Sequence, residues 1–265
     1  MPLLKTIAIP SFVAAMLIFM SQPLFADTAY LWGQVGGFPI CASLEQNDGL
    51  LSGWYFYQSQ ARQIRLQGQV HPNGTLHMEE MSGDRKTGVF EGQVKDGRWT
   101  GTWRKTDSAA PLPFHLEENR DQLANVTCDY QCTATERDTQ YHYTYQRSLK
   151  LAIANGVVTE FAASQKVHGG DQDEQMCAID LNDLTQIASD AGLLLQFEDD
   201  DSEADAGMCS VLIMGDKDLL WIRFGDTSVP GNDCRSAGST MFCSPRAFWN
   251  DIILDRRTKK CRALQ

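Results

Sequence analysis

Residues 64–105 read IRLQGQVHPNGTLHMEEMSGDRKTGVFEGQVKDGRWTGTWRK, and they carry the clearest pattern in the chain. Apolar and polar side chains alternate along four short runs, at 63–70, 75–81, 87–94 and 98–105, which is the period of a β-strand. The segments between them are His71-Pro72-Asn73-Gly74, Ser82-Gly83-Asp84 and Lys95-Asp96-Gly97. Asn-Gly and Asp-Gly supply the positive φ of tight hairpin turns, so the stretch predicts four consecutive antiparallel strands.

A glycine sits in the middle of three of these runs. The pattern is Leu66-Gln67-Gly68-Gln69-Val70, then Phe90-Glu91-Gly92-Gln93-Val94, and more loosely Trp99-Thr100-Gly101-Thr102-Trp103. A glycine weakens a strand unless it marks a bend or the close approach of another backbone, as in a small barrel. The repetition therefore predicts strong curvature.

The same spacing extends in both directions. Runs at 30–35, 39–44 and 52–58 come before the central stretch, and a run at 112–117 follows it, with Asn47-Asp48-Gly49 as a further turn. Eight hairpin-linked strands are typical of an antiparallel meander closed into a small up-and-down barrel. An open curved sheet packed on the rest of the chain is the alternative.

The meander resembles calycin-type barrels such as avidins and lipocalins through Gly101-Thr102-Trp103 and its turns. It is also similar to small exported β-barrel proteins that inhibit lysozyme, whose binding loop carries a Ser-Gly-x-x-Tyr element. Here Ser52-Gly53-Trp54-Tyr55 places the tyrosine one position early. No site residue is therefore transferred from either family.

The first 26 residues have the layout of a secretory signal peptide. One charged residue, Lys5, precedes an apolar run at 12–20, and Leu24-Phe25-Ala26 ends with a small residue at the expected cleavage point. The run is shorter than the roughly 20 apolar residues of a spanning helix and is flanked by Pro10 and Pro23. We expect a secreted or periplasmic protein with no transmembrane segment after cleavage.

The chain has eight cysteines, all outside the signal peptide. In an exported chain an even number favours disulfides, and we expect at least three bridges, with at least one pinning the segment 234–261. Cys41 is expected to reach across to Cys128 or Cys132. The close pair Cys128-x3-Cys132 lacks the matching partner pair of a zinc site, so no metal and no cofactor are expected. The cysteines assigned to disulfides are Cys41, Cys128, Cys132, Cys177, Cys209, Cys234, Cys243 and Cys261.

Cysteine and charge density both change near residue 120, which predicts a β-meander or barrel module at 27–120 and an acidic disulfide-rich module at 121–265. The first carries 11 acidic and 9 basic residues, and the second carries 23 and 13. The net charge of the whole chain is −11. Such an acidic protein disfavours nucleic acid as a partner and favours a cationic protein.

The second module is predicted as a β-dominated α+β unit. Strands are expected at 140–149, 150–154, 157–163, 193–197, 209–214 and 219–224, with a last apolar element at 248–254. Between them, residues 179–188 place Leu181, Leu184 and Ile187 on one face of a helix. Residues 119–137 are predicted as an irregular connection, 168–175 as a polar loop and 225–247 as a long disulfide-pinned loop.

Several groups of side chains are candidates for binding. Tyr55 and Tyr57 alternate with Trp54 and Phe56, so one pair is expected to fill the barrel and the other to form an exposed face. Glu198, Asp199, Asp200 and Asp201 begin an acidic run that fails the EF-hand pattern, because Ala206 replaces the turn glycine and Leu212 the final glutamate. A solvated acidic loop is the simpler interpretation. The basic residues Arg256, Arg257, Lys259, Lys260 and Arg262 are expected to offset this acidity or to stay solvated.

No catalytic signature is present. The histidines form no H-E-x-x-H array, the chain has no G-x-S-x-G elbow, and no nucleotide-binding glycine motif occurs. We therefore expect a non-enzymatic binding protein of the cell envelope, with an inhibitor of a cationic, lysozyme-like hydrolase as its most concrete form. A carrier of small apolar ligands in the barrel is the first alternative. A hydrolase of surface polymers that uses two facing carboxylates is the second.

Overall fold

The computed structural model is built from β-strands, and it contains no helix among the residues it describes. Those residues are 27–108, 110–118, 123, 126–138, 142–169, 175–180, 184–187, 189, 192–197, 210–224 and 251–264. The mainly β class is confirmed. The expected helical component is not found in this part of the chain. The described residues therefore include no helix that could cross a membrane.

The first eight strands close into an antiparallel barrel, in which each strand pairs with the next and β1 pairs with β8. The barrel prediction is thus confirmed, and the open curved sheet is not formed. The barrel strands are β1 (Asp27–Val35), β2 (Phe38–Asn47), β3 (Leu50–Tyr57), β4 (Ile64–Val70), β5 (Thr75–Ser82), β6 (Arg85–Lys95), β7 (Arg98–Lys105) and β8 (Leu112–Glu118).

The mid-strand glycines mark close approaches between backbones, as the sequence predicted. A Cβ on Gly92 would lie 2.0 Å from the carbonyl oxygen of Thr100, and one on Gly101 would lie 2.1 Å from that of Glu91. These two glycines face each other across β6 and β7. Only a residue without a side chain fits at either position, so the curvature of the wall depends on them.

The remaining strands form two further antiparallel sheets. The outer sheet has the order β12-β11-β10-β9, and the middle sheet has the order β13-β14-β15-β16-β17-β18. The strands of the outer sheet are β9 (Cys128–Asp138), β10 (Tyr143–Ala154), β11 (Val157–His168) and β12 (Gln175–Asp180). The strands of the middle sheet are β13 (Leu184–Ile187), β14 (Leu193–Phe197), β15 (Ser210–Gly215), β16 (Leu219–Phe224), β17 (Ile252–Asp255) and β18 (Lys260–Ala263).

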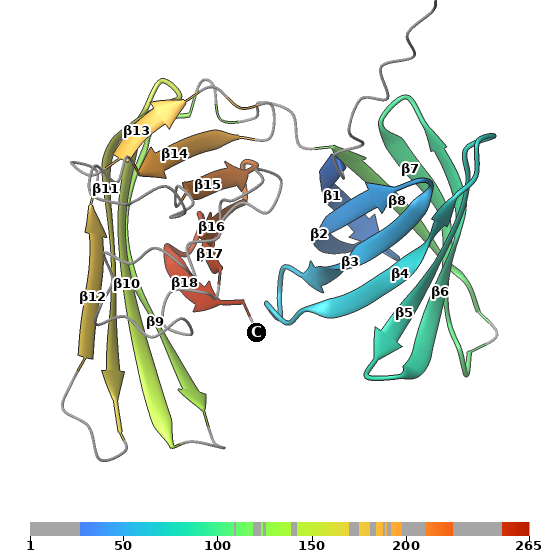
Figure 1. The fold of residues 1–265 in the computed structure, drawn as a ribbon, viewed down its shortest axis with the longest axis horizontal. Coiled ribbons are helices and arrows are strands. Elements are labelled where there is room, and N and C mark those ends of the chain that lie inside the picture. The colour runs from blue at the N-terminus through green and yellow to red at the C-terminus, as the bar shows by residue number, and fades with distance from the viewer. Residues whose placement is uncertain are drawn as a thin grey trace, which may run out of the picture.

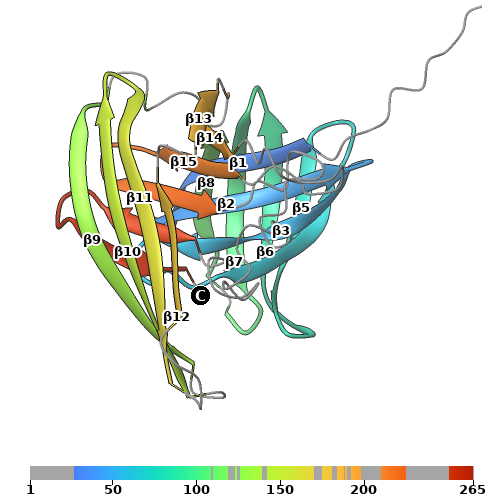
Figure 2. The ribbon, with the colours of Figure 1, turned by 60° about the vertical axis from the view of Figure 1, so that its left-hand side comes forward.

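The three units stack as layers, with the middle sheet between the outer sheet and the barrel (Figures 1 and 2). Strand β16 shows why. Leu220, Ile222 and Phe224 pack with the apolar face of the outer sheet, whereas Leu219 and Trp221 pack against the outer wall of the barrel. A strand covered on both faces has no solvent side, which explains the continuous apolar run from 219 to 222.

An aromatic cluster joins the barrel to the middle sheet. The ring of Trp221 lies 5.1 Å from that of Trp54, 5.3 Å from Phe56 and between 5.7 and 5.8 Å from those of Trp32 and Tyr30. All four partner rings come from β1 and β3 of the barrel. Burial of large aromatic rings is a dominant stabilising term, so the barrel and the middle sheet share one core.

The predicted helix at 179–188 is wrong. Strand β12 runs to Asp180, and Leu184–Ile187 forms β13, which pairs antiparallel with β14. The side chain of Gln186 fixes β13 from the other side, because it accepts a hydrogen bond from the Val158 amide and donates one to the Gly156 carbonyl. Pairing with distant residues therefore overrides the local helical spacing.

Besides β13, three further strands lie where none was expected. Strand β9 occupies the predicted connection, β12 follows the predicted polar loop, and β18 is part of the basic cluster. In β9 the alternation was hard to recognise because its inward positions include the small residues Cys132 and Ala134. The predicted strands at 140–149 and 150–154 are one strand, β10.

Candidate functional site

The side chains of β3 split as the alternation predicted, with Tyr55 and Tyr57 inside the barrel and Trp54 and Phe56 outside. Tyr55 is only 1% exposed and belongs to the core of the barrel, which Tyr57 joins as a partly buried side chain. The outward pair is covered by Trp221 of the middle sheet. Neither pair therefore forms the exposed aromatic face that we expected.

Tyr55 belongs instead to a polar cluster around a buried carboxylate. Its hydroxyl donates a hydrogen bond of 2.7 Å to Oε2 of Glu80, which also accepts one of 3.0 Å from Nε1 of Trp103. The hydroxyl of Thr87 donates to Oε1 of Glu80 at 2.7 Å. Glu80 is 9% exposed, and we call these four residues the Glu80 cluster.

Two features of the backbone build the cluster. The pairing of β5 with β6 shifts between Glu80 and Met81, which face Gly88 and Lys86, so Thr87 is the extra residue of a β-bulge. Bulges re-aim side chains and are frequent beside functional sites. The next residue, Gly88, leaves room for the indole of Trp103, since a Cβ there would lie 2.7 Å from Nε1 of Trp103 and 3.2 Å from Oε2 of Glu80.

The electrostatics of the two tyrosines follow from this arrangement. Burial raises the pKa of Tyr55 far above its usual range, and the adjacent Glu80 carboxylate raises it further. Burial also raises the pKa of Tyr57, against the lowering effect of its hydrogen bond with Tyr55. Both side chains therefore stay neutral hydrogen-bonding groups at physiological pH.

The Glu80 cluster lies toward one end of the barrel, where β3 and β5 end and β2 begins. Phe38, the first residue of β2, is 61% exposed there, and its ring contacts that of Tyr57 at 6.4 Å between centroids. Tyr57 in turn contacts Tyr55 at 5.5 Å. A series of edge-to-face rings thus connects the surface to the buried carboxylate.

A groove lies on the outer wall of the barrel, toward the opposite end. It spans β2 to β5 and has a volume of about 620 Å³. Leu50, which is 63% exposed, stands at its edge. We call it the outer groove, and its lining residues are Glu45, Asn47, Leu50, Leu51, Ser52, Gln67, Gly68, Gln69, His77 and Glu79.

The lining of the outer groove is acidic and amide-rich. Glu45 and Glu79 supply carboxylates, and no lysine or arginine is among the described residues that line it. Lys86, which stands outside the lining, donates a hydrogen bond of 2.9 Å to Glu79 and is the main cause of the lowered pKa of that carboxyl. His77 lies 3.9 Å from both Glu79 and Glu91. Such a surface attracts cationic groups.

A second buried polar cluster lies in the contact between the barrel and the middle sheet. Nη1 of Arg223 donates to the hydroxyls of Tyr30 and Ser43 at 2.8 and 3.1 Å, and its Nε lies 4.0 Å from Oδ2 of Asp251. That same oxygen accepts a 2.6 Å hydrogen bond from Nε1 of Trp221. Burial raises the pKa of Asp251 to about 6, against the lowering effects of Arg223 and Trp221.

The basic residues at the end of the chain are partly engaged within the fold. Arg256 donates a 3.1 Å hydrogen bond to the hydroxyl of Tyr130 in the outer sheet. Arg262 donates to the carbonyls of Gln58 and Ser59 on the barrel. These two residues bind the β17–β18 hairpin to both neighbouring layers and do not simply offset an acidic loop. The acidic candidates Glu198, Asp199, Asp200 and Asp201 lie outside the described residues.

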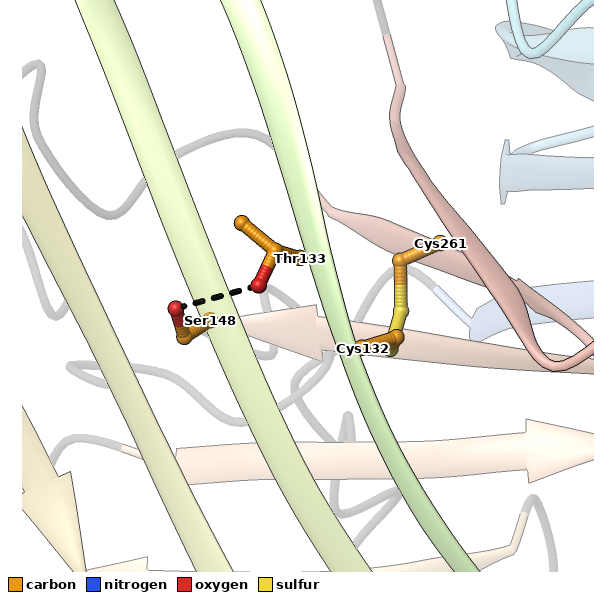
Figure 3. Close-up of a disulfide and its surroundings, with 4 residues drawn as sticks. All are labelled: Cys132, Thr133, Ser148 and Cys261. Carbon is orange, nitrogen blue, oxygen red and sulfur yellow. Dashed lines mark hydrogen bonds between the residues drawn. A yellow bond between two sulfur atoms is a disulfide. The ribbon is translucent and has the colours of Figure 1, made fainter.

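One disulfide is described, between Cys132 of β9 and Cys261 of β18 (Figure 3). It confirms that a bridge pins the last segment, and it is consistent with an oxidising, extracytoplasmic compartment. The expected bridge from Cys41 to Cys128 or Cys132 is wrong, because Cys41 and Cys128 are free thiols. Cys41 packs on the barrel side of the middle sheet and Cys128 on the opposite side, so the sheet separates them.

The other cysteines assigned to disulfides cannot be placed in bridges. Cys209, Cys234 and Cys243 lie outside the described residues, as does the side chain of Cys177. No group of histidine, cysteine, aspartate and glutamate side chains suited to a metal ion occurs within the described ranges.

The sequence pointed to Tyr55, a member of the Glu80 cluster, and to its neighbour Tyr57, but not to Glu80 itself. The available signal was Glu79-Glu80, two adjacent carboxylates in an alternating strand, of which one must point inward. The architecture is that of an eight-stranded meander barrel packed on a two-sheet sandwich. The chain matches no known family model, no curated protein and no solved structure.

Proposed function

We propose that this protein is an exported, non-enzymatic binding protein that docks a cationic protein into the outer groove. The observation that carries the proposal is the groove itself, which combines carboxylates and amides with the exposed Leu50 and has no lysine or arginine among the described residues that line it. Interfaces of this kind combine an apolar contact with a polar rim.

The charge of the whole chain supports a cationic partner. A net charge of −11 steers a positively charged protein toward the surface, and the groove carboxylates Glu45 and Glu79 then supply local complementarity. A lysozyme-like hydrolase is the concrete partner that this chemistry suggests, and inhibition is the expected consequence of docking.

The interior of the barrel gives less support to a carrier of apolar ligands. Its core is occupied by side chains, including the fully buried Leu66, Leu76, Met78 and Phe90. An apolar ligand would have to displace packed groups, at a cost comparable to overpacking a core.

Binding to an immobilised lysozyme, measured by biolayer interferometry, tests the proposal. Salt shortens the Debye length, beyond which exposed charges no longer attract each other appreciably, so affinity is expected to fall by about tenfold or more between about 25 mM and about 500 mM salt. The double substitution Glu45→Gln, Glu79→Gln should weaken binding at low salt. Glu117→Gln, an exposed carboxylate on β8 outside the groove, serves as the matched control.

Two results would count against the proposal. One is the absence of binding to lysozyme and to other cationic proteins. The other is binding that is insensitive to salt and to the groove substitutions.

A further inference from the structure

The carboxylate of Glu80 has no cationic partner among the residues that the structure describes. Among the described residues no lysine, arginine or histidine forms an ion pair with it, and its hydrogen bonds come from the neutral donors Tyr55, Thr87 and Trp103. Burying a carboxylate without a counter-charge costs free energy, and an apolar residue of similar size is often more stabilising at such a site. Stability alone therefore gives a poor account of Glu80.

The surroundings of Glu80 are nevertheless specifically built. The bulge at Thr87 turns a hydroxyl toward the carboxylate, and the glycine at position 88 makes room for the indole of Trp103. A carboxylate offers about four acceptor positions, and three are used. One acceptor position is thus left on a fixed, preorganised anion.

The aromatic rings near Glu80 extend to the surface of the barrel. Trp103 and Tyr57 are partly buried, and Phe38 is largely exposed. The face of an aromatic ring attracts a cation, and the attraction grows where water is excluded. The combination of a fixed carboxylate and several rings is suited to an organic cation and not to a neutral apolar ligand.

We propose that the Glu80 end of the barrel binds an ammonium or guanidinium group, with Glu80 as the counter-charge and Phe38, Tyr57 and Trp103 as the ring contacts. A bound cation would supply the Coulomb attraction that Glu80 does not receive from the described residues. The site is separate from the outer groove and involves none of its lining residues. The group could be supplied by a small molecule or by a lysine or arginine side chain of a protein.

The indole N–H of Trp103 provides a direct readout, because it donates to Glu80. The chain has six tryptophans, so the indole region of a ¹H–¹⁵N correlation spectrum is simple, and Trp103→Phe identifies the resonance. We expect n-butylguanidinium to shift this resonance saturably and the neutral analogue n-butylurea to leave it unchanged. Glu80→Gln should weaken the affinity at least tenfold, whereas Glu91→Gln, on the outer wall, should not change it.

The source of the cation is distinguished by further titrations. A shift with n-butylguanidinium alone indicates a small molecule, and the same shift with a capped arginine peptide or with lysozyme indicates a protein side chain. The proposal is overturned if n-butylguanidinium gives no saturable shift, if n-butylurea gives the same shift, or if Glu80→Gln binds as tightly as the wild type.

Should Glu80→Gln fail to fold, the affinity of Phe38→Ala for n-butylguanidinium tests the proposal instead. Phe38 is exposed, so its removal leaves the core intact. Unchanged affinity in that variant would overturn the proposal. The groove substitution Glu45→Gln leaves this end of the barrel intact, so failure of the cation site and failure of the outer groove are measured separately.

Discussion

Replacing Asp251 by asparagine should change how the stability of the protein depends on pH. Asp251 is buried between the barrel and the middle sheet, and its pKa in the folded protein is raised to about 6 from the ordinary 3.8. A raised carboxyl pKa means that the folded state favours the protonated form. The resulting stabilisation is fully present below pH 3.8 and is lost as the pH rises through about 6.

The size of the effect follows from the shift. About two pKa units at 1.36 kcal/mol each correspond to about 3 kcal/mol of unfolding free energy. Asparagine keeps an oxygen that can accept the hydrogen bond from Trp221 but carries no proton to lose. The stability of Asp251→Asn relative to wild type should therefore increase by about 2 kcal/mol between pH 4 and pH 7, because part of the full effect already falls below pH 4.

Urea unfolding of both proteins at unit pH intervals measures this difference. Groups that titrate alike in the two proteins, such as the Asp255 carboxyl with its lowered pKa, cancel in the comparison. The reasoning is refuted if the difference stays constant across this range or changes in the opposite direction.

Two further predictions concern the covalent and backbone constraints. Reduction of Cys132–Cys261, or its replacement by two alanines, should lower the unfolding free energy by about 2–4 kcal/mol, and chemical denaturation followed by tryptophan fluorescence with and without reductant measures this. Because the layers share a core through Trp221, barrel and sheets should unfold in one transition, and two separated transitions would contradict this. Gly101→Ala should destabilise the protein markedly or prevent folding, since its Cβ would lie 2.1 Å from the Glu91 carbonyl, and circular dichroism on heating tests it. Gly83→Ala serves as a comparison with backbone strain alone: its Cβ meets nothing within 4 Å, but its φ of +60° should cost about 1 kcal/mol.

The barrel was predictable because its information is local. Most of its strands are joined to the next by a short turn such as Asp96-Gly97, and the predicted limits 98–105 coincide with those of β7. The closure of the sheet into a barrel was indicated by Gly92 and Gly101, because a mid-strand glycine is needed where two backbones approach too closely for a side chain. Register and curvature were thus encoded within a few residues of where they act.

The rest depends on contacts between distant segments. Leu184–Ile187 has a helical spacing of apolar residues, and only its pairing with β14 makes it a strand. Cys41 looked like a partner for Cys128 because the sequence cannot show that a sheet lies between them. At the candidate site, Tyr55 was identified but Glu80 was not, because the bulge that aims Thr87 at Glu80 is a property of two strands together.

The position of the middle sheet has a consequence for the order in which the chain can fold. All the pairing partners of the barrel are present once Glu118 has been synthesised, so the barrel can close early. Its outer wall then displays Trp32, Trp54 and Phe56 until Trp221 arrives to cover them. Strand β18 brings Cys261, so the disulfide can form only after the 129 positions that separate Cys261 from Cys132 have been synthesised. Between these events the nascent protein exposes an aggregation-prone aromatic patch. A chaperone that covers this patch would act during that interval.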